Sequence, residues 1–316
     1  MTGRRNRVHR AHRRFDNLDA VQNGFFEEQL WQIKSRTYDR KYPNLKARQF
    51  IPLDTEIDPT TDTLKIRSYS QVGAAQLLKT YADDLPRSDI TADEMTVTFK
   101  GIGGSYGYGL DEVRKAARAR LNLDAAKGAA ARRAIEVQID RVLAVGDAAT
   151  GLVGLLNQAN ALIYTVPAGA SAATEWANKT PTEITADLIG ICEYIYDTTN
   201  EVESANMIII PRLQMTQIRT TRMDPQDKTT ILAWFKEVYP GVGIDTWTRM
   251  RGAGAGGADR MIAYSMTPDH LQGAVPQEFE QLPPQERGLE FVIPCHARVG
   301  GVAVYYPYSM AYGDGI

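Results

Sequence analysis

Alternating runs of apolar and polar residues are the first feature of the chain. The segment TLKIRSYSQVG, which starts at residue 63, alternates in this way, and EMTVTFKGI alternates again with Met95, Val97 and Phe99 on one face. A period of two residues is typical of β-strands. Because a polar, proline-containing stretch separates the two runs, the pattern predicts a long antiparallel hairpin.

Apolar residues at three-to-four spacing predict two helices early in the chain. One covers residues 15–40, and its apolar stripe comprises Leu18, Val21, Phe25, Phe26, Leu30 and Ile33. The other covers about residues 123–146 and would be roughly 35 Å long. Its apolar face comprises Ile135, Ile139, Val142 and Leu143, whereas Arg132, Arg133, Glu136 and Asp140 lie on its other faces. Only one strip of this long helix can pack on a sheet, so the rest is expected to meet water or another molecule.

From residue 182 the pattern changes to alternating helices and short strands. Helices are predicted over 182–199, 211–220 and 228–238, with the buried strand NMIII after the first of them. The segments GIDTWTRM and DRMIAYSM flank RGAGAGGA, which we interpret as a mobile hairpin tip. The closing segment GLEFVIPCHARVGGVAVYYPYSMAYGDGI predicts two strands that turn at HARVGG. These elements together indicate an α+β protein that carries an inserted α/β domain.

Composition excludes several classes of protein. No apolar run approaches the ~20 residues of a membrane-spanning helix, and the amino terminus is too basic for a signal peptide. The chain is therefore expected to work inside a cell, or inside something made there. The two cysteines, Cys192 and Cys295, form no metal-binding pattern and are expected to be buried free thiols.

The net charge of −2 hides a strong asymmetry. Residues 1–14 contain six arginines, two histidines and no acidic residue, which leaves 30 basic and 38 acidic residues, or −8, for the remainder. The arginines are Arg4, Arg5, Arg7, Arg10, Arg13 and Arg14. Such an arm cannot form a core of its own. It is either a solvated tail or a segment that binds nucleic acid or acidic neighbouring subunits.

The segment FKGIGGSYGYGLDEV at residues 99–113 matches a nucleophile motif, G-x-S-x-G, around Ser105. It also comes close to a dinucleotide-binding glycine pattern. A nucleophile elbow needs a buried parallel strand and surrounding βα units. The preceding strand alternates instead, and Tyr106 and Tyr108 continue the alternation, so we expect an ordinary strand with a joint to the following helix.

The other candidates for chemistry are weak. His270 follows a Pro-Asp turn, and His296 lies beside Cys295 in a predicted strand, where adjacent side chains point to opposite faces. Asp83, Asp84 and Asp89 have no fixed ligand spacing and are expected in a solvated or intersubunit loop. We therefore predict no catalytic residue, no cofactor and no metal.

The order of the parts resembles that of the Hong Kong 97-type major capsid proteins of tailed bacteriophages. The segment VLAVGDAATGLVGLLN at 142–157 is similar to the family's helix-end signature, Gly-Asp followed by Leu-x-Gly-Leu-Leu. YADDLPRSDITADEMTVTF resembles the descending arm of its hairpin, and GVAVYYPYSMAY looks like its closing strand. The resemblance covers nearly the whole chain from about residue 50.

This resemblance implies five regions. They are an N-terminal arm (1–55), an E-loop hairpin (56–94), a peripheral or P-domain (95–165) with its spine helix, an axial or A-domain (166–284), and closing strands of the P-domain (285–316). The E-loop would contact a neighbouring subunit through Lys79, Asp83, Asp84, Arg87 and Asp89. An A-domain loop would meet its copies around symmetry axes through Arg251, Gly252, Gly254, Gly256 and Gly257.

The implied function is a structural shell subunit that assembles through pentamers and hexamers into an icosahedral head around double-stranded DNA. Expected partners are copies of the chain, packaged DNA, a scaffolding protein, a portal and a decoration protein, with no membrane. The expected location is the virion, after assembly in the host bacterial cytoplasm. Two alternatives stay open: an encapsulin-like bacterial nanocompartment shell, and a serine hydrolase that uses Ser105 with His270 or His296.

Overall fold

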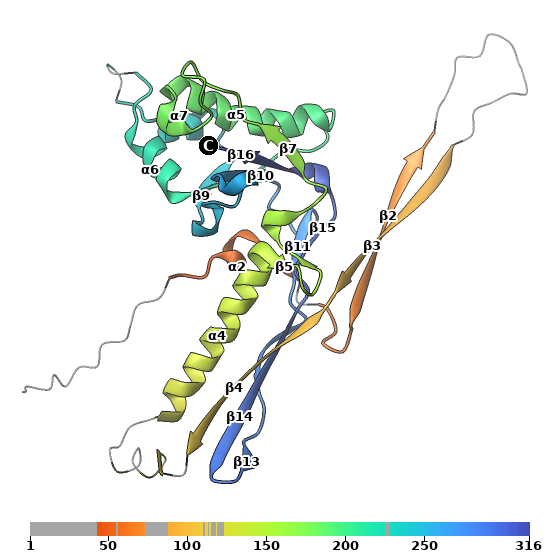
Figure 1. Ribbon diagram of the computed structural model, residues 1–316. Coiled ribbons are helices and arrows are strands. Elements are labelled where there is room, and N and C mark those ends of the chain that lie inside the picture. Colours follow the sequence, from red (N-terminus) through yellow and green to blue (C-terminus); the bar gives the residue numbers. More distant parts are fainter. Residues whose placement is uncertain are drawn as a thin grey trace, which may run out of the picture. The chain divides into compact units, whose positions relative to one another are not determined.

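The computed structural model describes residues 43–316 except 55, 74–87, 110, 113, 115–117, 119–122, 225 and 227 (Figure 1). The six arm arginines and the helix predicted over 15–40 lie outside the described residues. So do Lys79, Asp83, Asp84 and Arg87.

A long helix lies against a pair of long antiparallel strands. Helix α4 (Leu123–Val145) packs on β4 (Lys100–Gly109), and β4 pairs along its whole length with β14 (Glu290–Val299) (Figure 1). The predicted apolar face of the helix is confirmed, because Ile135, Ile139, Val142 and Leu143 are all buried. On the far side of β14 lie the short strands β12 (Gln277–Gln281) and β13 (Gln285–Arg287).

The predicted hairpin is also confirmed. Strand β2 (Thr63–Val72) pairs in antiparallel register with β3 (Asp89–Thr98), from Thr63 opposite Thr98 to Val72 opposite Asp89. The residues before it form a turn, in which the Asp58 carboxylate accepts hydrogen bonds from the backbone and hydroxyl of Thr60.

A five-stranded sheet separates two hydrophobic cores. Its order is β7 (Leu162–Thr165), β16 (Met310–Asp314), β10 (Arg260–Tyr264), β8 (Met207–Ile210) and β9 (Gly243–Thr246). Ile208, Ile210 and Met261 enter the core beneath helices α5 (Pro181–Thr198), α6 (Arg212–Thr220) and α7 (Ile231–Val238). The alternating residues Ile209 and Ile262 enter the core that also contains the apolar face of α4. The inner strands β8 and β10 are buried on both faces, which explains why they are almost continuously apolar.

The remaining elements are short and connect these parts. A three-stranded sheet consists of β1 (Leu53–Asp54), β11 (Leu271–Ala274) and β15 (Val302–Val304). The other elements are α2 (Ala47–Phe50), β5 (Gly146–Asp147), β6 (Leu152–Val153), and five 3₁₀ turns: η1 (Leu155–Asn157), η2 (Trp176–Asn178), η3 (Thr248–Met250), η4 (Ala255–Gly257) and η5 (Pro307–Ser309).

The hairpin predicted around the glycine-rich segment does not form, whereas the turn predicted at HARVGG is present. Strands β9 and β10 flank the glycine-rich segment as expected, but β8 lies between them in the sheet, so this segment is not a hairpin tip. Strands β14 and β15 turn at Gly300 and Gly301, but they pair with β4 and β11 rather than with each other. The residues assigned together as closing strands, 285–316, are therefore divided among three sheets, and β16 lies inside the five-stranded sheet.

The Gly-Asp and Leu-x-Gly-Leu-Leu signature has a steric basis. Gly146 follows the end of α4 at a φ of 75°, and a Cβ there would lie 2.2 Å from the Leu152 carbonyl oxygen. Gly154 in turn leaves no room for a Cβ, which would lie 2.6 Å from the Ala144 carbonyl carbon. The two glycines therefore allow the chain to fold back tightly against the end of the helix.

We predict that Gly146→Ala destabilises the protein more than Gly151→Ala does. Both glycines have positive φ angles, but a Cβ at Gly151 meets no atom within 4 Å. The left-handed conformation alone should cost about 1–2 kcal/mol at either position, and only Gly146→Ala adds a backbone clash. Thermal unfolding of the two purified variants, followed by tryptophan fluorescence, measures the difference. Equal losses of stability would show that the clash is relieved.

Candidate functional site

The hydrolase arrangement around Ser105 is not present. Ser105 lies exposed in the middle of β4, opposite Pro294 of an antiparallel partner, and the strand continues to Gly109. A nucleophile elbow requires a sharp turn from a strand into a helix at this point. In the described part of the chain, no hydrogen bond joins Ser105 to His270 or His296.

His270 is held by polar contacts to two neighbouring side chains. One ring nitrogen lies 2.6 Å from the Thr267 hydroxyl, and the other lies 2.7 Å from a carboxylate oxygen of Glu203. Its ring packs beside Tyr306. These contacts hold the loop after α5 against the segment before β11, which is the role of a satisfied structural histidine.

Neither thiol is suited to nucleophilic or metal chemistry. Burial raises the pKa of the Cys192 thiol to about 12 and also raises the pKa of Cys295. Both groups are therefore protonated at neutral pH. Over the described residues, no group of three histidine, cysteine or acidic side chains could hold a metal ion.

The β2–β3 hairpin contacts the rest of the described chain through one end. Leu64, Ile66 and Met95, which share one face of the hairpin, pack on a small core of Ile57, Val97, Phe99, Ala274 and Ala303. Arg298 adds an ion pair to Asp62 at 2.6 Å and donates a hydrogen bond to the Pro59 carbonyl. Among the described residues, the rest of the chain therefore covers the apolar face of the hairpin only near this end.

The opposite face of the hairpin exposes apolar side chains farther along. Tyr69 is 68% exposed and Ile90 is 63% exposed, and the register places both on the face away from Leu64 and Met95. The predicted contact residue Asp89 is exposed at the last described pair. Exposed aromatic and aliphatic groups on a ribbon of this kind mark a surface that another molecule can cover.

The glycine-rich loop between β9 and β10 is held by two carboxylates. Asp259 accepts a hydrogen bond from the Gly252 backbone at 3.0 Å, and Asp314 accepts one from the Ala255 backbone at 3.0 Å. Gly252, Gly256 and Gly257 have positive φ angles. These hydrogen bonds anchor the loop, in which Arg251, Gly252, Gly256 and Gly257 are exposed and Gly254 is half-buried.

Asp314 was not found by the sequence analysis, because its partner lies far away in the chain. Both carboxylate oxygens bind the Arg260 guanidinium, at 2.6 and 2.8 Å. Burial alone would raise the pKa of this carboxyl, but the hydrogen bonds from Arg260 and Ala255 together hold its pKa below the usual value. A lone aspartate in the otherwise uncharged closing segment MAYGDGI was the one available signal.

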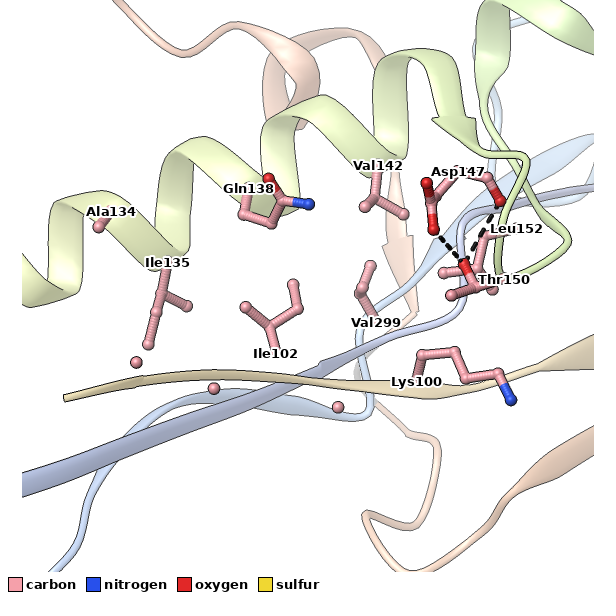
Figure 2. Close-up of a pocket in the computed structure, with 13 residues that line it drawn as sticks. Lys100, Ile102, Ala134, Ile135, Gln138, Val142, Asp147, Thr150, Leu152 and Val299 are labelled. Carbon is pink, nitrogen blue, oxygen red and sulfur yellow. Dashed lines mark hydrogen bonds between the residues drawn. The ribbon is translucent and has the colours of Figure 1, made fainter.

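A groove of about 440 Å³ lies between α4 and β4 (Figure 2). Its apolar lining comprises Ile102, Ile135, Val142, Leu152 and Val299, and its polar lining includes Lys100, Gln138, Asp147 and Thr150. Ile135 and Val142 point from the helix toward the strand, and Asp147 accepts a hydrogen bond from the Thr150 hydroxyl at 2.7 Å (Figure 2). The sequence analysis did not predict this groove.

A family model described as "Major capsid protein" matches residues 73–316. The chain belongs to the major capsid protein family. It is thus a structural protein of the capsid, and its location is the virion. The comparisons support neither the nanocompartment shell nor the hydrolase, and a structural capsid family implies a non-enzymatic role. The comparison with curated proteins found no match.

Solved capsid structures show the same fold. A chain of "The capsid of Myoviridae Phage XM1" superposes with a TM-score of 0.79 at 16% identity, over 92% of this chain and 98% of that one. "Capsid of native GTA particle" gives 0.62 at 10% identity, over 90% and 94%. "Mycobacterium phage Ogopogo" gives 0.60 at 10% identity, over 91% and 97%. The predicted Hong Kong 97-type α+β fold is confirmed. Among the helices that the structure describes, none is long and apolar enough to cross a membrane.

We predict that Asp314→Asn loosens the loop around residues 251–258 in this capsid protein. The substitution removes the charge that Arg260 and Ala255 bind, so amide hydrogen exchange of the loop should become faster. The matched control is Asp269→Asn, an exposed aspartate outside this network, which should leave the exchange unchanged. An unchanged rate of amide hydrogen exchange for this loop in Asp314→Asn would show that Asp314 does not anchor it.

The ion pair between Asp314 and Arg260 also makes the stability of the folded chain depend on pH. Because the Asp314 pKa is lower in the folded than in the unfolded chain, its stabilisation is complete above about pH 3.9 and is lost as the pH falls through the lower folded value.

Proposed function

We propose that copies of this chain assemble into a closed icosahedral shell of pentamers and hexamers around double-stranded DNA. The observation that carries this proposal is the β2–β3 hairpin, which packs on its own body near one end and exposes Tyr69 and Ile90 on its free face. The solved structures of similar fold, described as phage and particle capsids, support the same function.

A neighbouring copy supplies the surface that the hairpin lacks. An isolated two-stranded hairpin is marginally stable in water, and the small core at its base leaves the distal residues uncovered. Covering Tyr69 and Ile90 on an adjacent subunit removes exposed apolar area and also orders the hairpin. Obligate contacts of this kind bury about 2,000 Å² or more. Repetition of one such contact with rotation closes a ring or shell.

We assign the other regions to structural roles in the same assembly. The P-domain (95–165), with α4 as its spine, forms the shell wall, and the A-domain (166–284) directs the loop at Arg251 and Gly252 toward the symmetry axes. We include strand β16 in the A-domain rather than with the closing strands of the P-domain, because it pairs with β10. The E-loop contact continues from Asp89 through Lys79, Asp83, Asp84 and Arg87.

The arginine-rich arm binds packaged DNA or neighbouring subunits inside the shell. Six arginines in residues 1–14 suit either partner, because phosphates and acidic side chains are bound by the same guanidinium groups. A scaffolding protein, a portal and a decoration protein are the further partners, and assembly takes place in the host bacterial cytoplasm.

Electron microscopy of the purified, expressed protein tests the proposal. Closed shells, tubes or isolated rings are the expected result. A population of stable monomers that forms none of these at high protein concentration would overturn it.

We predict that Tyr69→Ala combined with Ile90→Ala blocks or weakens assembly without unfolding the subunit. Both side chains are exposed in the single chain, so their removal should change the stability of the unassembled protein by less than about 0.5 kcal/mol. Sedimentation velocity measures the fraction in particles. Ser68→Ala, on the opposite face of the same strand, is the matched control. Normal particle yield from the double variant would show that this face is not the contact.

A further inference from the structure

The three helices on one face of the five-stranded sheet form a layer with α7 in the middle. Helix α5 packs on β7 and β16 at one side of the sheet, whereas α6 packs on β9 at the opposite side. Helix α7 contacts both of these helices (Figure 1). The outer sides of α5 and α6 therefore face in opposite directions.

The outer side of α5 is acidic. Residues 180–211 include six aspartate and glutamate residues and no lysine, arginine or histidine. Asp197 and Glu201 are exposed, and within the described residues no hydrogen bond or ion pair involves their carboxylates. Asp197 lies one helical turn after Tyr194, whose ring packs beside Tyr164 of β7. This surface, which we call the α5 edge, therefore lies on the side of the helix away from α7.

The outer side of α6 is basic. Residues 204–223 include three arginines and no acidic residue. Arg212 and Arg219 are exposed and lie about two turns apart on one side of α6. Gln217, on the opposite side of the helix, donates a hydrogen bond to the carbonyl of Trp176, which is itself bound to α5. This surface, which we call the α6 edge, therefore faces away from α5, and its two guanidinium groups have no partner in the described part of the chain.

The two edges match each other but cannot meet within one chain, because the helix layer separates them. Each also exposes one aliphatic side chain, Val202 (77%) beside the α5 edge and Leu213 (73%) beside the α6 edge. A second copy placed next to the first in the same orientation brings an acidic edge against a basic one. A contact between two different faces repeats with rotation and can close a ring.

We propose that the α5 edge of one copy binds the α6 edge of the next copy around each ring, through ion pairs of Asp197 and Glu201 with Arg212 and Arg219. This inference rests on the proposed assembly, because it requires copies arranged in rings. It adds that the contact is electrostatic and that every ring has one direction, since an edge cannot pair with its own kind.

Two charge-reversed chains test the proposal. Asp197→Arg with Glu201→Arg makes both edges of the first chain basic, and Arg212→Glu with Arg219→Glu makes both edges of the second chain acidic. Neither chain can pair with itself, but each can pair with the other. We expect no rings or particles from either chain alone and recovery of rings when equal amounts are mixed. Recovery also shows that both chains are folded.

The number of copies in a ring provides a sharper result. Rings in which the two chains alternate match every edge when they contain six copies, whereas five copies leave one contact between like charges. The mixture should therefore form hexamers with few pentamers, and sheets or tubes rather than closed shells, as electron microscopy would show. A single chain with all four changes has its edges exchanged, so it should form pentamers and closed shells again.

Each outcome decides one part of the proposal. Closed shells from either charge-reversed chain alone would overturn this inference and leave the proposed assembly intact. Chains that are folded by circular dichroism but form no rings when mixed would also overturn it. Absence of particles from the unsubstituted protein is a failure of the proposed function, which is detected before any variant is compared.

A milder pair of substitutions gives a second measurement. Asp197→Asn with Glu201→Gln keeps the shape of the α5 edge but removes its charge, so the protein concentration needed for ring formation should rise roughly threefold to tenfold at low salt. The difference should vanish near 1 M salt, where charges are screened within about 3 Å. The matched control is Glu237→Gln, exposed on the middle helix α7, which should leave the concentration unchanged. An unchanged concentration in the double variant would overturn the electrostatic contact.

Discussion

The buried carboxylate of Asp140 joins three segments that are distant in the sequence. It lies on α4, accepts the Ala47 backbone hydrogen bond of α2, and binds the Arg249 guanidinium at 2.7 and 2.9 Å. Arg249 belongs to η3, which follows β9, a strand at the edge of the five-stranded sheet. A buried charge is tolerated only when its partners are in place. The long helix, the incoming chain and the sheet domain are therefore fixed together at one point, and the surfaces that this capsid protein presents depend on it.

A second connection lies at the signature after α4. Tyr312 donates a hydrogen bond to the Leu155 carbonyl at 2.6 Å, and Arg260 donates one to the Leu156 carbonyl at 2.6 Å. The Leu-x-Gly-Leu-Leu segment is therefore more than a helix end, because its carbonyl groups bind the strands β16 and β10. The Arg260–Asp314 ion pair links this signature to the glycine-rich loop, because Arg260 binds the Leu156 carbonyl and Asp314 accepts a hydrogen bond from the Ala255 backbone. The proposed axial surface and the segment after the spine helix therefore belong to one hydrogen-bonded network.

Local periodicity was sufficient to predict most elements, because the hairpin strands and α4 each carry their own repeating apolar face. The pairing of β2 with β3 was predicted, but pairing in the five-stranded sheet was not, since β9 and β10 are consecutive strands in the sequence but each pairs with β8 instead. Asp140 was expected away from the apolar face of the helix, in contact with water or another molecule, and its burial depends on Arg249, which is 109 residues away. The groove was not predicted, because it is formed by β4, α4 and Val299 together.

Strand β16 occupies an inner position in its sheet, between β7 and β10. It is also the described strand nearest the carboxyl terminus, so the ribosome makes it after every neighbour with which it pairs. Until then β10 lacks one of its two partners and β7 has none, and contacts between such distant segments form slowly. A prematurely terminated polypeptide would lack this strand and would therefore leave the five-stranded sheet open between β7 and β10.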